Sequence, residues 1–247
     1  MERIAVFAAL RWECVPVLRH IRQARRHRLG EFTAWRGPAG GFDMWLVQTG
    51  MGQERAAAAV AALREMGPFN LFLSTGCAGA LAPELGPGDL AVATTVIGTP
   101  SGERFETDAT TRARVRTAAE RVAVRTTVGP LLCSGTVLGT AVAKQTAAAE
   151  TGAVAVEMEG AAIGAGAQQM GVPFAAVRAI LDTASTELDT SAGFVDPQTG
   201  GVRPLPLLRY VARRPSRLPY LMGLQRMTVA AQRSLEQFFK AFLNHAD

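Results

Sequence analysis

Apolar residues along this chain gather in short runs that are continuous rather than alternating with polar ones. Such runs are typical of β-strands that are covered on both faces. The pattern therefore predicts a buried sheet, most of it parallel. The expected strands are Arg3–Ala9, Met44–Thr49, Leu71–Thr75, Leu90–Ile97, Val128–Cys133, Ala153–Val156 and Phe174–Ile180.

Between several of these runs the apolar positions recur at helical spacing. Gly67–Pro68 and Gly171–Val172–Pro173 supply stop signals for two of the helices. Because strands and helices alternate, we expect an α/β fold with a central mixed, largely parallel sheet flanked by helices. The expected helices are Glu54–Met66, Thr111–Val122, Ala141–Thr151, Glu159–Met170, Pro206–Arg213 and Leu218–Leu243.

The domain organisation follows from length and charge. At 247 residues and 48% hydrophobic content, the chain is long enough for one large core. We expect residues 1–190 to form this core, and residues 191–247 to form a loop and basic amphipathic helices packed on the same domain. The net charge is +5, but residues 201–247 alone carry +6, so the basicity belongs to the C-terminal segment.

Several classes of protein and of chemistry are disfavoured. The first apolar run is too short for a secretory signal, and no segment reaches the roughly 18 apolar residues of a membrane span, so we expect a cytoplasmic protein. The three cysteines lack a CxxC spacing, and the three histidines have no evident nucleophile to serve. We therefore expect no metal, no cofactor and no catalytic triad.

Carboxylates stand at the ends of three predicted strands. Glu13 follows the first, Glu157 and Glu159 follow the sixth, and Asp182 follows the seventh, four residues after Arg178. Two of them have structural alternatives: Glu13 as a surface residue of a first helical turn, and Asp182 as the partner of a buried arginine or as a capping residue. Together, at one edge of a sheet, they suit acid–base work on an uncharged, hydroxyl-rich ligand.

Two glycine turns, TGMG at Thr49–Gly52 and STGCAGAL at Ser74–Leu81, follow strand-like runs. Glycines there let a backbone N–H approach a ligand, although tight connections alone also use them. If Ala153–Glu159 is extended, Glu157 and Glu159 point to one side and Met158 to the other.

These residues resemble the purine nucleoside phosphorylase superfamily, and within it the 5′-methylthioadenosine/S-adenosylhomocysteine nucleosidases. The matching motifs are AALRWE, TGMG, STGCAGALAPELGPGDL, AVEMEGAAI and PFAAVRAILD, in family order over roughly residues 3–185. The resemblance implies a nucleoside substrate and a homodimer.

The resemblance also implies roles for individual residues. Glu159 would accept hydrogen bonds from the ribose hydroxyls, Asp182 would protonate purine N7, and Glu13, helped by Arg178, would activate water. Met158 would pack on the sugar. The rest of the implied substrate pocket is Met51, Cys77, Ala78, Gly79, Leu138 and Glu157.

Two departures from the family pattern affect the predicted substrate. Leu138 stands where the nucleosidases have a phenylalanine that stacks on adenine, which weakens the expected base preference. Ser74 stands where bacterial phosphorylases have an arginine, which favours hydrolysis over phosphorolysis, although Arg11 or Arg55 could substitute.

The C-terminal segment, VRPLPLLRYVARRPSRLPYLMGLQRM, more loosely resembles that of the hopanoid-associated nucleosidases, which remove adenine from adenosylhopane. Its leucines and arginines alternate in a basic amphipathic pattern that suits either packing on the domain or peripheral contact with an anionic membrane. The arginines are not interleaved with a base-stacking platform, so we expect no nucleic-acid partner.

We therefore expect a nucleosidase that releases adenine from a 5′-substituted adenosine, with adenosylhopane as the preferred substrate. Methylthioadenosine or S-adenosylhomocysteine is the alternative nucleosidase substrate, and a phosphate-dependent phosphorylase is the alternative enzyme. The alternative of another class is a non-catalytic protein that binds nucleosides or a lipid surface.

Overall fold

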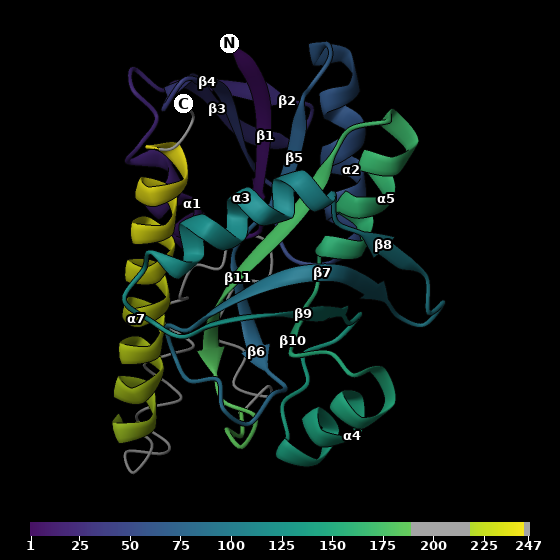
Figure 1. Cartoon of the computed structure of the whole chain (residues 1–247), viewed down its shortest axis with the longest axis vertical. Coiled ribbons are helices and arrows are strands. Elements are labelled where there is room, and N and C mark those ends of the chain that lie inside the picture. Colours follow the sequence, from purple (N-terminus) through teal and green to yellow (C-terminus); the bar gives the residue numbers. More distant parts are fainter. Residues whose placement is uncertain (189–217, 245–247) are drawn as a thin grey trace.

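The computed structural model describes residues 1–188 and 218–244 (Figure 1). A mixed sheet of eleven strands runs through the described part of the chain, in the order β2-β3-β4-β1-β5-β11-β6-β10-β9-β7-β8. The predicted loop at Thr190–Arg203 and the predicted helix Pro206–Arg213 lie outside the described residues. The strands are β1 (Glu2–Ala8), β2 (Arg25–Leu29), β3 (Phe32–Ala39), β4 (Phe42–Gln48), β5 (Leu71–Ser74), β6 (Cys77–Ala80), β7 (Leu90–Gly98), β8 (Arg104–Glu106), β9 (Thr126–Cys133), β10 (Ala155–Glu157) and β11 (Phe174–Asp182).

The sheet has two parts that share β11. Strands β4, β1, β5 and β11 are parallel neighbours and form an open half. Beyond them β11 pairs with both β6 and β7, so that β11, β6, β10, β9 and β7 close into a ring. In this ring β10 runs antiparallel to β6. The end of β10 therefore meets the start of β6, next to the end of β5.

Helices cover both faces of the open half. Apolar residues of α2 and α5 pack on one face with Phe7 and Phe72, and those of α1, α3 and α7 pack on the other with Ile4 and Val6. In Figure 1, α4 lies apart from both layers, beside the ring. The helices are α1 (Arg11–Leu18), α2 (Gln53–Leu63, continued by the 3₁₀ turn Arg64–Met66), α3 (Ala109–Glu120), α4 (Ala141–Thr151), α5 (Gly160–Met170) and α7 (Leu218–Leu243).

The predicted α/β fold with a mixed sheet flanked by helices is confirmed, and all seven predicted strands are present. Four further strands and helix α1 were not predicted. The condition for Glu157 and Glu159 to point to one side is not met: the chain is not extended through Ala153–Glu159, because β10 ends at Glu157 and the chain bends into α5. No helix among the described residues is long and apolar enough to cross a membrane.

Candidate active site

Glu13 joins the end of β1 to the start of β6. It lies in the first turn of α1 and is 4% exposed. Its Oε2 accepts a hydrogen bond from the amide of Leu10 at 2.9 Å, and its Oε1 accepts one from the amide of Cys77 at 2.7 Å. Gly76 has φ +139°, and a Cβ there would lie 2.9 Å from Oε1. The pKa of Glu13 lies above its ordinary value, because the effect of burial exceeds the opposite effects of the two amides and the charge of Arg178.

Glu157 is the carboxylate that holds the buried arginine. Its Oε2 accepts from Arg178 Nη2 at 2.5 Å, and the same nitrogen donates to Ser74 Oγ at 2.7 Å. Both oxygens of Glu157 also accept from the amide of Gly160, at 3.0 and 2.8 Å, and Oε2 accepts from the amide of Glu159 at 3.1 Å. Glu157 therefore caps the start of α5 and neutralises Arg178.

This arrangement differs from the predicted one for Arg178. We expected Arg178 to help Glu13, but its hydrogen bonds go to Glu157, Ser74 and its own strand, at Val177 O. Its interaction with Glu13 is electrostatic: the charge of Arg178 lowers the pKa of Glu13.

Within the described part of the chain, the carboxyl group of Glu159 accepts fewer hydrogen bonds than that of Glu157. It is partly buried, and its Oε1 accepts from the amide of Gly52 at 2.7 Å. Gly52, with φ +94°, precedes α2 and belongs to the first glycine turn. Burial and the neighbouring charge of Glu157 raise the pKa of Glu159 to about 8. The side chain is thus able to hold or release a proton near neutral pH.

Asp182, at the end of β11, is paired with a lysine that the sequence motifs did not indicate. Lys144 of α4 is 1% exposed, and its Nζ donates to Asp182 Oδ2. It also donates to Thr183 O at 2.8 Å and to Thr186 O at 2.9 Å. Burial raises the pKa of Asp182, and the lysine lowers it. A Cβ on Gly79 would lie 3.3 Å from Asp182 Oδ2, so β6 passes close beside the carboxylate.

A sequence signal for Lys144 existed. The chain has 26 Lys and Arg residues, of which only Lys144 and Lys240 are lysines. Lys144 also lies in an alanine-rich helix without other charges in its first turns. Its partner is 38 residues away in the sequence, so the pairing itself could not be inferred from local patterns.

The remaining predicted pocket residues line different parts of this region. Met51 and Met158 are partly buried and adjoin Gly52 and Glu159 in the sequence. Ala78 is buried in the core with α2 and α5. Leu138 is partly buried and packs on an apolar cluster of Leu81, Ile97, Leu132, Ala147, Ala153 and Val156.

The described part of the chain shows neither a metal-binding cluster nor a reactive thiol at the site. Within residues 1–188 and 218–244, no cluster of three or more His, Cys, Asp or Glu side chains could hold a metal ion. Burial raises the pKa of the Cys77 thiol well above its usual value, and Glu13 raises it further. A thiol with a raised pKa is a poor nucleophile.

The three parts of the site are continuous along β6 and β11. Cys77 and Gly79 of β6 contact Glu13 and Asp182, respectively, and the amide of Ala179 on β11 bonds to Gly76 at the start of β6. The site therefore contains three carboxyl groups, those of Glu13, Glu159 and Asp182. Such a set can activate water, bind hydroxyls and donate a proton to a leaving group.

The chain is similar in sequence to proteins of one enzyme superfamily. Residues 3–199 match the phosphorylase superfamily. The 5′-methylthioadenosine/S-adenosylhomocysteine nucleosidase of Actinobacillus succinogenes is 30% identical over 182 residues, which cover 67% of this chain and 79% of that protein. The enzyme of the same name from Glaesserella parasuis is 27% identical over 203 residues, 75% of this chain and 87% of that protein.

A solved structure shows the same fold. The S-adenosylhomocysteine nucleosidase of Streptococcus pyogenes, in complex with 5-methylthiotubericidin, superposes with a TM-score of 0.78 at 23% identity, covering 100% of this chain and 98% of that chain. The match to the superfamily spans most of the chain and includes every carboxylate of the site. The chain therefore belongs to the phosphorylase superfamily and is a nucleosidase of that superfamily, an enzyme that hydrolyses N-glycosidic bonds.

Proposed function

We propose that this nucleosidase releases adenine from a 5′-substituted adenosine. The observation that carries the proposal is the set of three carboxyl groups in three different settings. Glu13 is held by two amides, Glu159 has a pKa of about 8, and Asp182 is paired with a lysine. Carboxyl groups in different surroundings can take different acid–base roles at one pH.

In the proposed reaction, water adds to C1′ of the ribose while the bond from C1′ to N9 breaks. Glu13 accepts a proton from the attacking water, and Asp182 donates one to N7, so that neutral adenine leaves with the electron pair of the broken bond. Glu159 binds the ribose 2′- and 3′-hydroxyls as positive charge develops on the sugar, and Met158 packs on the ring. A positioned general acid typically contributes about 10²–10⁴-fold in rate.

Hydrolysis is favoured over phosphorolysis because the buried and half-buried arginines of this region already have partners within the protein. Arg178 is already neutralised by Glu157, and Arg55 donates to Thr49 O and to Glu31. Arg11 is exposed. A phosphate dianion would have to compete with these partners for its counter-charge. Adenine release measured with and without added phosphate tests the choice, because a strict phosphate requirement would make the protein a phosphorylase.

The preferred 5′ substituent is a large apolar group, as in adenosylhopane. Supporting this choice, Met51 is a partly buried apolar side chain, and it adjoins Gly52, whose amide binds Glu159. A small 5′ group, as in methylthioadenosine, is the alternative. Comparing kcat/KM for methylthioadenosine with that for an adenosine carrying a polycyclic 5′ group decides between them, since tenfold preference for the small substrate would reject the apolar assignment.

The non-catalytic alternative is tested by removing the proposed general acid. Asp182→Asn keeps the size of the side chain but cannot donate the proton that the leaving group requires. We expect kcat to fall by about 10²-fold or more. If Asp182→Asn left the turnover of every tested nucleoside unchanged, Asp182 would not be the general acid.

We also propose that the protein forms a homodimer, as its resemblance to the nucleosidases implies. Separately, we propose peripheral membrane contact through the first half of α7. In that half Met222 and Val229 are 49% and 38% exposed, and the exposed Arg226 lies between them. An exposed apolar and basic surface suits anionic lipid. Light scattering reports the dimer, and co-sedimentation with anionic but not neutral vesicles reports the contact. A monomer, or equal binding to both vesicles, would reject the respective assignment.

A further inference from the structure

Lys144 is unusual in having its charge fully enclosed. Its side chain is 1% exposed, and its three oxygen partners are Asp182 Oδ2, Thr183 O and Thr186 O. An ammonium group has three N–H donors in a roughly tetrahedral arrangement, so all three are used. Arginine, with a planar fork of donors, does not match three oxygens arranged in this way. A chain that uses arginine almost everywhere else keeps a lysine at this position.

Because Lys144 binds one carboxyl oxygen of Asp182, the two oxygens have different surroundings. Oδ2 is bound to the lysine, whereas Oδ1 accepts no hydrogen bond within the described part of the chain. Gly79 lies beside both oxygens: a Cβ there would be 3.3 Å from Oδ2 and 3.4 Å from Oδ1. The glycine therefore leaves room next to the carboxylate where any other residue would place a side chain.

We propose that Lys144 is a positioning residue for Asp182, holding one carboxyl oxygen so that the other is presented to the departing purine. The proposal rests on the proposed function, in which Asp182 protonates N7. The lysine fixes the carboxyl group from α4 and, through the two carbonyls, also fixes the turn at residues 183–186 that follows β11. It acts on the substrate only through Asp182.

The charges around Asp182 indicate the electrostatic consequence. The charged group that faces Asp182 from α4 is Lys144, and the ionisable group that faces it from β6 is Cys77, whose thiol stays neutral because burial raises its pKa. Lys144 thus lowers the pKa of Asp182 against the effect of burial. Removing the lysine leaves burial alone, which raises the pKa of a carboxyl group.

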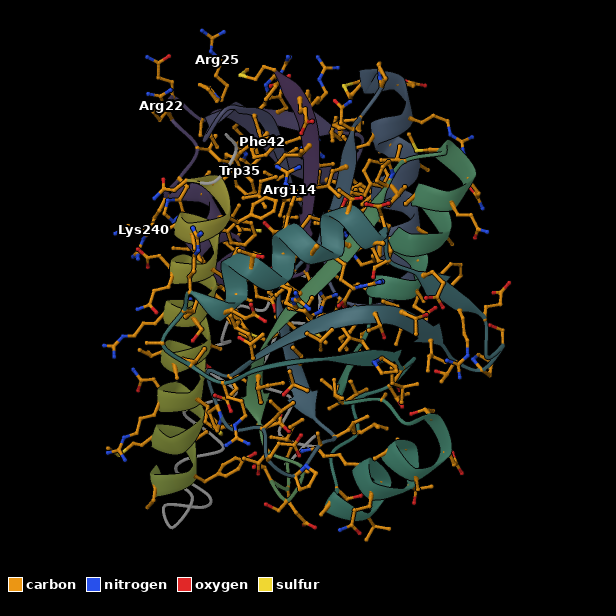
Figure 2. The ribbon with its side chains drawn as sticks, viewed as in Figure 1. Arg22, Arg25, Trp35, Phe42, Arg114 and Lys240 are labelled. Atoms are coloured by element: carbon orange, nitrogen blue, oxygen red, sulfur yellow. The ribbon has the colours of Figure 1, made fainter. Side chains whose placement is uncertain are left out.

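The test compares Lys144→Met with Lys240→Met, which removes the other lysine of the chain from the exposed side of α7 (Figure 2). In Lys144→Met we expect kcat to fall by about tenfold or more, KM to change by less than about threefold, and the pKa of Asp182 to rise by about one unit or more. The pKa is read from the ¹³C signal of the Asp182 carboxyl group, assigned by its loss in Asp182→Asn. Lys240→Met should change none of these quantities.

A purely structural role predicts a different result. In the Asp182→Asn background, Lys144→Met should lower kcat no further if the lysine acts through Asp182. An equal additional loss in both backgrounds, or an unchanged pKa of Asp182, would overturn the proposal. If no nucleoside is turned over by the unaltered protein, the proposed function fails, yet the carboxyl titration still decides whether the lysine controls Asp182.

A second measurement covers the case in which Lys144→Met does not fold. With two lysines in the chain, the ammonium groups give at most two ¹⁵N–¹H signals, and Lys240→Met assigns them. We expect the Lys144 signal to persist in the unaltered protein, because burial and three acceptors slow its exchange, and to shift or vanish in Asp182→Asn. A Lys144 signal that is identical in both proteins would contradict the pairing.

Discussion

Glu157 and Glu159 are separated by one residue, yet their surroundings assign them different tasks. Glu157 accepts hydrogen bonds from Arg178 and from two backbone amides at the start of α5, so its charge is fully used within the protein. Among the described residues, the Gly52 amide is the one hydrogen-bond donor to the Glu159 side chain, and the charge of Glu157 acts on the same carboxyl group. The bend after β10 separates the two side chains, and it leaves Glu159 as the one that can exchange hydrogen bonds with a ligand.

The buried pair of Glu157 and Arg178 gives a prediction of stability. Glu157→Gln preserves the shape but leaves the Arg178 guanidinium, 1% exposed, without its counter-charge. Breaking a buried pair in this way costs about 3–5 kcal/mol of unfolding free energy, measured by urea denaturation. The control is Glu236→Gln, which breaks an exposed pair with Arg19 and should cost less than about 1 kcal/mol. Equal losses in the two variants would mean that Glu157 is not the partner on which Arg178 depends.

The raised pKa of Glu159 gives a prediction of pH dependence. Folding raises this pKa from the ordinary 4.5 to about 8, so the folded state holds the proton more tightly than the unfolded state does. The resulting stabilisation is complete below pH 4.5 and is lost as the pH rises toward 8. We therefore expect the unfolding free energy of the unaltered protein, relative to Glu159→Gln, to decrease between these pH values. A difference that is independent of pH would show that Glu159 titrates normally.

At the scale of elements, the site depends on the close approach of α5 to the sheet. Gly164 of α5 faces β8 and β11: a Cβ there would lie 2.7 Å from Phe105 Cβ and 3.1 Å from the ring of Phe174. Small residues along this helix therefore set the position of its first turn, which directly follows Glu157 and Glu159 in the chain. A side chain at this position would push α5 away from the sheet.

Gly164→Ala should consequently destabilise the protein, although alanine is the better helix former. We expect a loss of about 1–2 kcal/mol, because overpacking a tight contact outweighs the gain in helix propensity. The matched control is Gly223→Ala in α7, where no atom lies within 4 Å of the added Cβ. That variant should gain about 0.5–1 kcal/mol in thermal or urea unfolding. A gain in both variants would show that α5 can move at no cost.

The elements that the sequence pattern revealed are those with long apolar runs. Strands β2 and β3 were missed because Arg25–Leu29 is almost entirely basic and Phe32–Ala39 contains a glycine and a proline. Strand β6, with the sequence CAGA, was taken for part of a glycine turn, and α1 has Pro16 in its centre. These elements are specified by pairing with distant segments rather than by local preference.

The candidate site was predictable to the extent that its residues follow strands. Glu13, Glu159 and Asp182 could be found because charged residues directly after buried runs are conspicuous. The ring that turns β10 antiparallel to β6 could not be found, because it arises from the pairing of β11 with β7. Arg178 pairs with Glu157, and Lys144 pairs with Asp182. The partners lie far apart in the sequence, so these pairs are visible only in three dimensions.

For the whole molecule, α7 is the element that ties the open half of the sheet together. Its second half packs against α1 and α3, and Gln232 donates to the carbonyl of Trp12, next to Glu13, at 2.9 Å. Near its end, Phe242 stacks on Phe42 of β4, and Arg114 of α3 lies over both rings (Figure 2). The helix thus supports α1, which carries the proposed base.

The two halves of α7 should differ sharply in their effect on stability. Phe238 is fully buried and packs on Phe239 and Phe242, so Phe238→Ala should cost about 3–5 kcal/mol of unfolding free energy. Met222 is 49% exposed on the same helix, and Met222→Ala should change the unfolding free energy by no more than about 0.5 kcal/mol. Urea denaturation of the two variants at one protein concentration makes the comparison. A large loss in Met222→Ala would mean that the first half of α7 is covered in solution, and it would contradict the proposed contact of this surface with a membrane.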